Sequence, residues 1–257
     1  MNVSYEMTAG RFLVKTLSDP NDLKSAYALR YKVFQVEVVG NTITEGEDHD
    51  EFDLASDHLA IFDTSTNKMI ATCRLNCSLF SNQFYTAREF NCTQLLSRPE
   101  TKLEIGRVCV QENYRKGIII ILLWRAIAKY MVKTKSKIRF GCGSVMTENP
   151  DEAILLYRYL SDQGKVRHNM DITPQETYQS AEFNRYLKAP YSLSEQDRFH
   201  AESLLPPLCR SYFDIGCYIP GPPAFDHDFK CIDFLTVLES KDLDSRLRQK
   251  MFGEQTL

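Results

Sequence analysis

The segment from Leu103 to Trp124 contains the residue types of an anion-binding turn. An apolar strand leads into a polar turn that holds Arg115, Lys116 and Gly117, and an apolar helix follows. In such a strand–turn–helix, backbone N–H groups and the positive end of the helix face an anion such as a phosphate. Two cationic side chains add full charge there. An ordinary strand-to-helix connection with a cationic turn fits the same spacing, so both interpretations stay open.

A second group of residues that could bind a ligand lies in an acidic loop from about residue 40 to residue 57. Its carboxylates are Glu45, Glu47, Asp48, Asp50, Glu51, Asp53 and Asp57. They are suited to binding ammonium groups; the alternative is a solvated loop, and Asp53 is the strongest candidate. Arg30 and Arg74 flank the loop, and they either bind a carboxylate group of a ligand or pair with the loop carboxylates. His58 is either a base or a hydrogen-bonded structural residue.

Glu104 and Arg107 lie three residues apart on the strand that enters the cationic turn. On a regular strand they face opposite sides of the sheet. A β-bulge, which Gly106 would favour, brings them to the same side. Glu104 then serves either as a general base or as the partner that orients Arg107 or Arg74.

Positive charge is concentrated next to this turn. Residues 113–139 hold eight basic residues and no acidic ones: Arg115, Lys116, Arg125, Lys129, Lys133, Lys135, Lys137 and Arg139. Arg125, Lys129 and Lys133 are spaced by four, which places them along one helix face opposite the apolar face. This set forms either a docking surface for an acidic partner or a solvated helix face.

Alternating strands and helices are expected to position these residues. The patterns predict helices at about 23–34, 118–133, 150–160 and 194–204, a short helix with a loop at 84–96, and a charged terminal helix. They predict strands at 58–62, 69–74, 103–110, 138–145 and 231–238, the first two joined by a hairpin turn at 64–68. An early hairpin followed by alternating elements indicates an α/β sandwich with a mixed sheet.

Composition excludes several classes of protein. The 257 residues carry a formal charge of −3 and are 43% hydrophobic, values typical of a globular protein without a global preference for nucleic acid. The eight cysteines are scattered and lack metal-ligand spacing, so we expect thiols and no metal site. No signal peptide is apparent, and the longest apolar run, 118–124, is too short to span a bilayer. A cytoplasmic protein is expected.

The order of several short motifs resembles that of one known family. They are Arg30-x-x-x-Phe34-x-x-Glu37, Glu51-Phe52-Asp53, Asp57-His58-Leu59, Arg74, Phe84-Tyr85-x-x-x-Glu89-Phe90, Leu103-Glu104-x-Gly106-Arg107-x-Cys109-Val110, Pro206-Pro207-Leu208, Tyr212, Gly216, Asp226-His227-Asp228-Phe229, Asp233 and Phe252-Gly253. In this arrangement the chain resembles the ornithine-lipid N-acyltransferases, also labelled hemolysin-like, of the GNAT superfamily. It is more distantly similar to acyl-homoserine-lactone synthases.

The resemblance implies a GNAT fold and an acyl transfer from a thioester carrier to the amine of an amino acid. The acceptor would be ornithine, the acyl chain long and 3-hydroxylated, and the product a lyso-ornithine lipid. Val110 followed by Arg115 matches the start of the GNAT pantetheine loop, V-x-x-x-x-R-G-x-G-x-G, and Lys116 and Gly117 complete the expected donor site. Lys116, Ile118 and Ile120 occupy glycine positions of that motif, which favours phosphopantetheine on acyl carrier protein over acyl-CoA.

The same resemblance assigns roles to individual residues. Glu104 is expected to be the general base, Arg107 to act beside it, and Tyr157 to protonate the leaving thiolate, although a core tyrosine fits Tyr157 as well. The expected acceptor-binding residues are Arg30, Phe34, Asp53, His58 and Arg74. The helix face with Arg125, Lys129 and Lys133 would dock the acidic carrier, and it would also suit transient contact with anionic lipid at the inner membrane face.

The expected organisation is a GNAT core at residues 1–165, with residues 166–257 forming an extension that packs on the core and completes the sheet. The sheet would splay between the strands ending near Val110 and beginning near Ile138. A signal synthase of the acyl-homoserine-lactone type is the first alternative. A non-catalytic protein that binds acyl carriers or lipids is the second. An acetyl-CoA-dependent acetyltransferase fits least well, because the loop glycines are missing.

Overall fold

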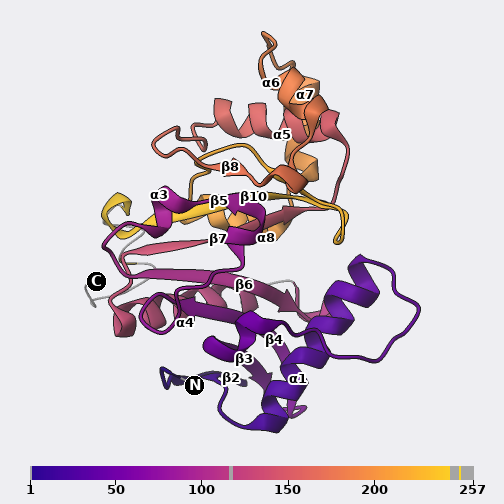
Figure 1. Ribbon diagram of the computed structural model, residues 1–257. Coiled ribbons are helices and arrows are strands. Elements are labelled where there is room, and N and C mark those ends of the chain that lie inside the picture. Colours follow the sequence, from indigo (N-terminus) through magenta and orange to yellow (C-terminus); the bar gives the residue numbers. More distant parts are fainter. Residues whose placement is uncertain (1, 116–117, 244–248, 250–257) are drawn as a thin grey trace. The chain divides into compact units, whose positions relative to one another are not determined.

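The computed structural model describes residues 2–115, 118–243 and 249 of the chain. The chain folds into two compact units (Figure 1). Within the described residues, the first unit comprises 2–84, 100–115 and 118–139 with Leu243 and Gln249, and the second comprises 85–99 and 140–242. The predicted division at residue 165 stays a prediction.

The first unit is built on five strands. They are β1 (Glu6–Ala9), β2 (Phe12–Thr16), β3 (Asp57–Asp63), β4 (Lys68–Cys77) and β6 (Lys102–Val110), hydrogen-bonded in the order β1-β2-β3-β4-β6. Every neighbouring pair is antiparallel. The predicted hairpin is confirmed, since Asp63 pairs with Lys68 and Asn67 adopts a positive φ of 57° at the turn. The N-terminal hairpin of β1 and β2 was not predicted.

Two helices cover the strands of this unit (Figure 1). α1 (Pro20–Tyr31) begins where Asp19 accepts hydrogen bonds from two backbone N–H groups, with proline in the first turn, so the helix has an acidic N-cap. It packs on β4, β3 and β6, while α4 (Ile119–Thr134) packs on β2 and β3. Tyr27 of α1 contacts His58, whereas Tyr130 of α4 donates a hydrogen bond to Asp57. Since adjacent strand residues face opposite sides, the two helices cover opposite faces.

A π-helical segment, Lys32–Val38, continues directly from α1. The predicted helix at about 23–34 is confirmed in position but not in its bounds: the α-helix begins at Pro20 and ends at Tyr31, and the π-helical segment extends to Val38. π-helical segments are rare and often lie at functional sites. Short 3-10 turns follow at Glu51–Ala55 and Glu112–Tyr114.

The second unit contains the remaining elements. Its helices are α2 (Thr86–Glu89), α3 (Thr93–Leu96), α5 (Pro150–Asp162), α6 (Ala181–Leu187), α7 (Glu195–Leu204) and α8 (Pro207–Asp214). Its strands are β5 (Phe90–Asn91), β8 (Thr173–Pro174), β9 (Ala224–Asp226), β10 (Cys231–Glu239) and most of β7 (Ile138–Val145). β7, β10 and β9 are neighbours in that order. Their core packs against α5, where Ala153, Leu156 and Leu160 are buried.

The strong patterns of this unit were predicted correctly, and the weak ones were not. α5, α7, β7 and β10 lie within two residues of their predicted bounds. The single short helix expected at 84–96 is instead α2 and α3 with β5 between them. α6, α8 and β9 were not predicted. The charged terminal helix falls almost entirely outside the described residues.

Candidate active site

A β-bulge in β6 sets the direction of the residues around Glu104. Arg74 of β4 pairs with Gly106 and Thr72 pairs with Cys109, so β6 holds one residue more than β4 over the same stretch. Arg107 is the extra residue of this bulge, and its backbone is left-handed, with a φ of 51°. The predicted bulge is thus confirmed.

The bulge places three important side chains on the same face. Arg107 and Arg74 both contact Asp50, so their side chains lie on one side of the strands. Glu104 pairs with Asn76, two residues from Arg74 on β4, and therefore faces that side too. Glu104 is only 3% exposed, and Asn76 Nδ2 donates to its Oε2 across 3.5 Å. A base candidate thus lies beside a group of buried arginines.

The acidic loop is held in place by its own carboxylates. Asp50 caps the short turn Glu51–Ala55: its side chain accepts from the Phe52 N–H across 3.0 Å. The Asp50 N–H donates in return to Asp53 Oδ2 across 2.8 Å. This reciprocal cap orients both carboxylates, so neither Asp50 nor Asp53 belongs to a solvated loop.

Three arginines and three aspartates form a buried cluster. We call this set the arginine–aspartate cluster; its members are Arg30, Arg74, Arg107, Asp48, Asp50 and Asp53. Arg30 Nη1 and Nη2 reach Asp53 Oδ1 and Oδ2 at 2.8 and 3.2 Å, and Arg30 also pairs with Asp48 at 2.8 Å. The Arg30 side chain is 1% exposed and that of Asp53 is 3% exposed. Such a bidentate, desolvated pair is geometrically specific.

Arg74 and Arg107 complete the cluster. Arg74 Nη1 contacts Asp50 and lies 3.2 Å from Asp53 Oδ1. Arg107 Nη2 lies 3.2 Å from Asp50 Oδ2. The side chains of this last pair are 16% and 14% exposed, so it is the more accessible edge of the cluster. The structure therefore shows Arg30 and Arg74 paired with loop carboxylates, and their acceptor-binding roles stay predictions.

The cluster changes the protonation equilibria of its neighbours. Burial alone would raise the pKa of Asp53, but the hydrogen bond and charge of Arg30 and the charge of Arg74 outweigh it and lower the pKa to about 2. Burial lowers the pKa of His58 to about 4, against a smaller opposing effect of Asp53. At neutral pH the Asp53 carboxylate is therefore ionised and lies beside a neutral His58 imidazole.

His58 differs from the structural histidine that the sequence suggested. Neither ring nitrogen has a hydrogen-bond partner among the described residues, and Nε2 lies 3.7 Å from Asp53 Oδ1. The ring meets Tyr27 edge-on, with centroids 5.6 Å apart. Phe34, also predicted to bind the acceptor, is half-buried in the π-helical segment.

The predicted donor loop follows β6. Arg115 Nε donates to the Val110 carbonyl across 3.0 Å, and its Nη2 pairs with Glu37 of the π-helical segment. The Arg115 side chain is 44% exposed, and an exposed pair contributes little to stability, so a phosphate could displace Glu37. Lys116 and Gly117 lie outside the described residues.

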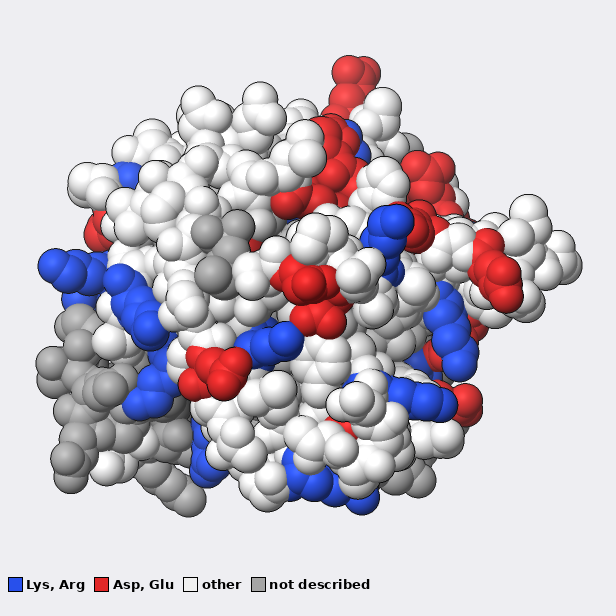
Figure 2. Space-filling view, turned by 90° about the horizontal axis from the view of Figure 1, so that it is seen from below, with Lys and Arg blue, Asp and Glu red and all other residues white. Residues whose placement is uncertain are grey.

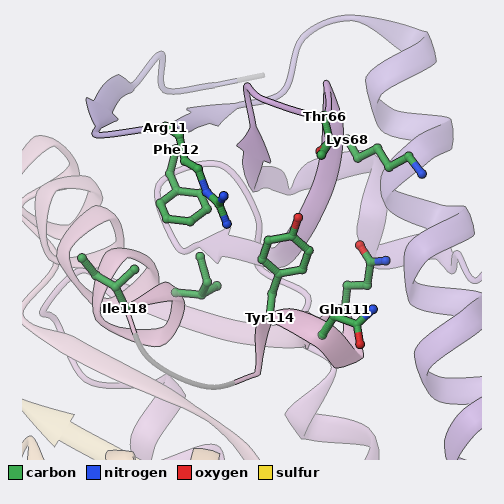
Figure 3. Close-up of a pocket in the computed structure, with 9 residues that line it drawn as sticks. Arg11, Phe12, Thr66, Lys68, Gln111, Tyr114 and Ile118 are labelled. Atoms are coloured by element: carbon green, nitrogen blue, oxygen red, sulfur yellow. The ribbon is translucent and has the colours of Figure 1, made fainter.

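A cavity of about 470 Å³ opens beside this loop. Figure 3 shows the rings of Phe12 and Tyr114 facing the same space, with Arg11 and Lys68 at its rim. Arg11 lies 3.3 Å from Asp63, which also accepts the Tyr114 hydroxyl at 2.9 Å. The cavity is therefore lined in part by polar groups and by the cationic side chains of Arg11 and Lys68.

The predicted basic face of α4 is confirmed in its geometry. Arg125 and Lys133 are exposed and Lys129 is half-buried, while the apolar residues between them are largely buried. Arg139, however, is 1% exposed and stacks on Trp124 at 5.1 Å, so it adds nothing to a surface patch. On the face that Figure 2 displays, basic and acidic side chains are interspersed. Carrier docking stays a prediction.

Tyr157 belongs to the core of the second unit. It is 5% exposed and meets Phe183 edge-on, with centroids 5.8 Å apart. Burial raises its pKa to about 12. This is the environment of a core tyrosine, and the role in leaving-group protonation stays a prediction.

The comparisons with known proteins agree with this site. An acetyltransferase (GNAT) domain model matches residues 29–125, a range that holds the arginine–aspartate cluster, Glu104 and the donor loop. The N-acyl amino acid synthase FeeM from uncultured soil microbes shares the fold at a TM-score of 0.52 and 8% identity, covering 94% of this chain and 96% of its own. The AHL synthase LasI does so at 0.51 and 12% identity, covering 99% and 98%. The predicted GNAT fold with a mixed sheet is confirmed, and fold and site define an acyltransferase.

Comparison with sequence relatives identifies the kind of acyltransferase. An L-ornithine N(alpha)-acyltransferase of Rhizobium meliloti (strain 1021) is 30% identical over 240 residues, covering 88% of this chain and 79% of that protein. One from Agrobacterium fabrum (strain C58) is 26% identical, covering 95% and 86%. The chain belongs to the L-ornithine N(alpha)-acyltransferase family, as the motif order predicted, and it is an N-acyltransferase.

The acyl donor and the amino-acid acceptor are the substrates that this class implies. Among the described residues, no helix combines the length and the apolar character needed to cross a bilayer.

Proposed function

We propose that this enzyme transfers a long-chain, 3-hydroxylated acyl group from acyl carrier protein to the α-amine of ornithine, giving a lyso-ornithine lipid. The observation that carries the proposal is the 30% identity to an L-ornithine N(alpha)-acyltransferase over 88% of the chain. We further propose that it acts in the cytoplasm and touches the inner membrane face transiently, where an amphiphilic product would leave.

Glu104 is the proposed general base. The acceptor's α-ammonium must lose a proton before its nitrogen attacks the thioester carbonyl. Glu104 would take that proton before the C–N bond forms. As the tetrahedral intermediate collapses, the C–S bond would break and the nitrogen would release a second proton, which balances the proton that the leaving thiolate takes up. Tyr157 is the proposed donor of the proton that the leaving thiolate takes up. Holding the reactants in line contributes up to about 7–11 kcal/mol in favourable cases.

The accessible edge of the arginine–aspartate cluster is the proposed acceptor site. An amino-acid head group carries one charge of each sign, like the Arg107–Asp50 pair at this edge. Its carboxylate would bind Arg107, and Asp50 would hold its ammonium until Glu104 takes the proton, so the cluster would stay neutral overall as the acceptor binds. Arg30, Asp53 and Arg74 would hold that edge in place, with His58 and Phe34 at its boundary.

The donor is proposed to bind at Val110, Arg115, Lys116 and Gly117, with its phosphopantetheine phosphate replacing Glu37 on Arg115. The carrier's acidic surface would dock on Arg125, Lys129 and Lys133 of α4. Electrostatic docking of this kind mainly raises the association rate and weakens as salt is added.

The test is a product assay with purified enzyme, a long-chain 3-hydroxyacyl carrier protein, and ornithine, lysine or glycine offered separately. We expect N-acylornithine by mass spectrometry, slower turnover with the matching acyl-CoA, and a loss of at least about 100-fold in kcat for Glu104→Gln. Glu112→Gln, an exposed carboxylate near the donor loop, is the matched control. Acyl transfer to lysine or glycine but not to ornithine would contradict the assignment of ornithine as the acceptor. Full activity of Glu104→Gln would contradict the assignment of Glu104 as the general base.

A second assay tests carrier docking. Lys133→Glu should raise the KM for the acylated carrier several-fold at low salt while leaving the KM for acyl-CoA unchanged. Lys24→Glu, on the exposed side of α1, makes the same charge change away from α4. Equal effects of the two variants would argue against docking on the α4 face.

A further inference from the structure

Three carboxylates and two thiols converge inside the second unit. The set, which we call the carboxylate–thiol cluster, consists of Glu89, Cys142, Asp226, Cys231 and Asp233. Glu89 ends α2, Cys142 lies on β7, Asp226 ends β9, and Cys231 and Asp233 belong to β10. Glu89 is 1% exposed, Asp233 3% and Asp226 4%. Burying several carboxylates together is unfavourable unless protons or a cation compensate their charge.

The spacing of the donor atoms is that of a coordination shell. One oxygen each from Glu89 and Asp233 and the sulfur of Cys142 lie within 4.8 Å of one another, and so do the donor atoms of Asp226, Cys231 and Asp233. Cys142 Sγ lies 3.3 Å from Glu89 Oε2, and Cys231 Sγ lies 3.5 Å from Asp233 Oδ2. Two ligands at tetrahedral Zn²⁺ distances, with S at about 2.3 Å and O at about 2.0 Å, lie about 3.5 Å apart.

Glu89 supplies an independent indication of a ligand. Its Oε1 is buried and has no hydrogen-bond partner among the described residues. Burial and the neighbouring charges of Asp233 and Asp226 raise its pKa well above the ordinary value. Neutral donors to this cluster include Ser144 Oγ, which reaches Asp233 Oδ1 at 2.6 Å, and the Asp228 N–H, which reaches Asp226 at 2.9 Å. The Tyr85 side chain also hydrogen-bonds to Glu89. A buried carboxylate oxygen without a donor is costly, and a cation would remove that cost.

We propose that Glu89, Cys142 and Asp233 bind one divalent cation of the Zn²⁺ type. Asp226 and Cys231 act as positioning residues around Asp233, which both groups of donor atoms share. Binding releases the protons held by the Cys142 thiol and the Glu89 carboxyl, and the cation takes their place. A thiolate ligand favours Zn²⁺ or Co²⁺ over Mg²⁺, which prefers an all-oxygen shell.

The inference does not depend on the proposed acyl transfer, and sequence spacing could not have suggested it. The three ligands are separated by 53 and 91 residues, and only the packing of α2, β7 and β10 brings them together. The sequence had indicated no metal site for that reason.

The test uses the full-length protein after chelation, titrated with ZnCl₂, CoCl₂ or MgCl₂. We expect one Zn²⁺ per chain, a thiolate-to-cobalt charge-transfer absorption with Co²⁺, and no comparable binding of Mg²⁺. Glu89→Gln and Cys142→Ser should each weaken Zn²⁺ binding by about 100-fold or more. Cys217→Ser, which alters another buried thiol of this unit, is the matched control and should bind as the wild type does.

Metal-free stability separates ligation from a purely structural role. Glu89→Gln removes a buried, repelled carboxyl, so the metal-free variant should be at least as stable as the metal-free wild type while losing the stabilisation by Zn²⁺. Zn²⁺ binding unchanged in Glu89→Gln and Cys142→Ser would overturn the proposal. Stabilisation by ornithine without metal, lost in the same variants, would also overturn it and identify an ammonium ligand instead.

Discussion

Replacing Asp53 by Asn tests whether charge balance holds the arginine–aspartate cluster together. The substitution keeps the shape of the side chain but leaves three buried arginines facing two carboxylates. Lowering the pKa of Asp53 from 3.8 to about 2 corresponds to about 2.4 kcal/mol of stabilisation by the folded state. Leaving a buried charge uncompensated typically costs about 3–5 kcal/mol. We therefore expect Asp53→Asn to lose about 3–5 kcal/mol of unfolding free energy.

The chain contains a convenient reporter for this measurement. Its single tryptophan, Trp124, is 8% exposed and lies on α4 in the same unit as the cluster. Urea titration followed by tryptophan fluorescence therefore reports the unfolding of the unit that holds the mutation. Far-UV circular dichroism on the same samples reports the whole chain.

Two comparisons sharpen the result. Asp162→Asn removes a carboxylate that pairs with Arg198 at the surface, and it should cost no more than about 1 kcal/mol. Adding Arg30→Met to Asp53→Asn restores the charge balance, so the double variant should lose less than the sum of the two single losses. A loss below about 1 kcal/mol for Asp53→Asn, or strict additivity, would refute the charge-balance argument.

Three further outcomes follow from the structure. The pKa of His58 in the folded protein, about 4, lies below its unfolded value of 6.5. Its contribution to the free energy of unfolding is therefore complete above pH 6.5 and is lost as the pH falls toward 4. Urea titrations should show a loss of about 2 kcal/mol between pH 7 and 5, and His58→Asn should reduce that loss. Lys135 ends α4 with a left-handed φ of 53°, so Lys135→Gly should stabilise by about 0.5–1 kcal/mol, whereas Lys137→Gly should not. A Cβ on Gly221 would lie 2.1 Å from the Ile172 carbonyl oxygen, so Gly221→Ala should cost about 1–3 kcal/mol or more, read as a lower thermal midpoint.

Local patterns allowed much of the fold to be predicted. Proline with an acidic or amide cap marked the starts of α1 and α5, and segments rich in apolar residues marked β6, α4 and β7. These signals act within a few residues, and nothing in the tertiary structure opposed them. The short elements α6, α8 and β9 lack such signals, since their stability depends on packing within the second unit.

The candidate site was predictable in its residue types but not in its pairings. Arg30, Asp53, Arg74, Glu104 and Arg107 were identified, and the bulge was expected from Gly106. For Asp48 and Asp50, however, a solvated loop had stayed an open alternative. Which carboxylate meets which arginine depends on contacts across 18 to 59 residues of chain, and residue types alone do not specify them.

The closed charge balance of the arginine–aspartate cluster also constrains how this part of the molecule can evolve. Any single substitution that changes a charge creates a poorly folded intermediate, even where a second substitution would restore neutrality. Evolution must therefore replace an arginine and its aspartate partner nearly together, or make the first substitution in a protein that other substitutions have already stabilised. The cluster is thus expected to show strong epistasis, with its six positions inherited as one unit.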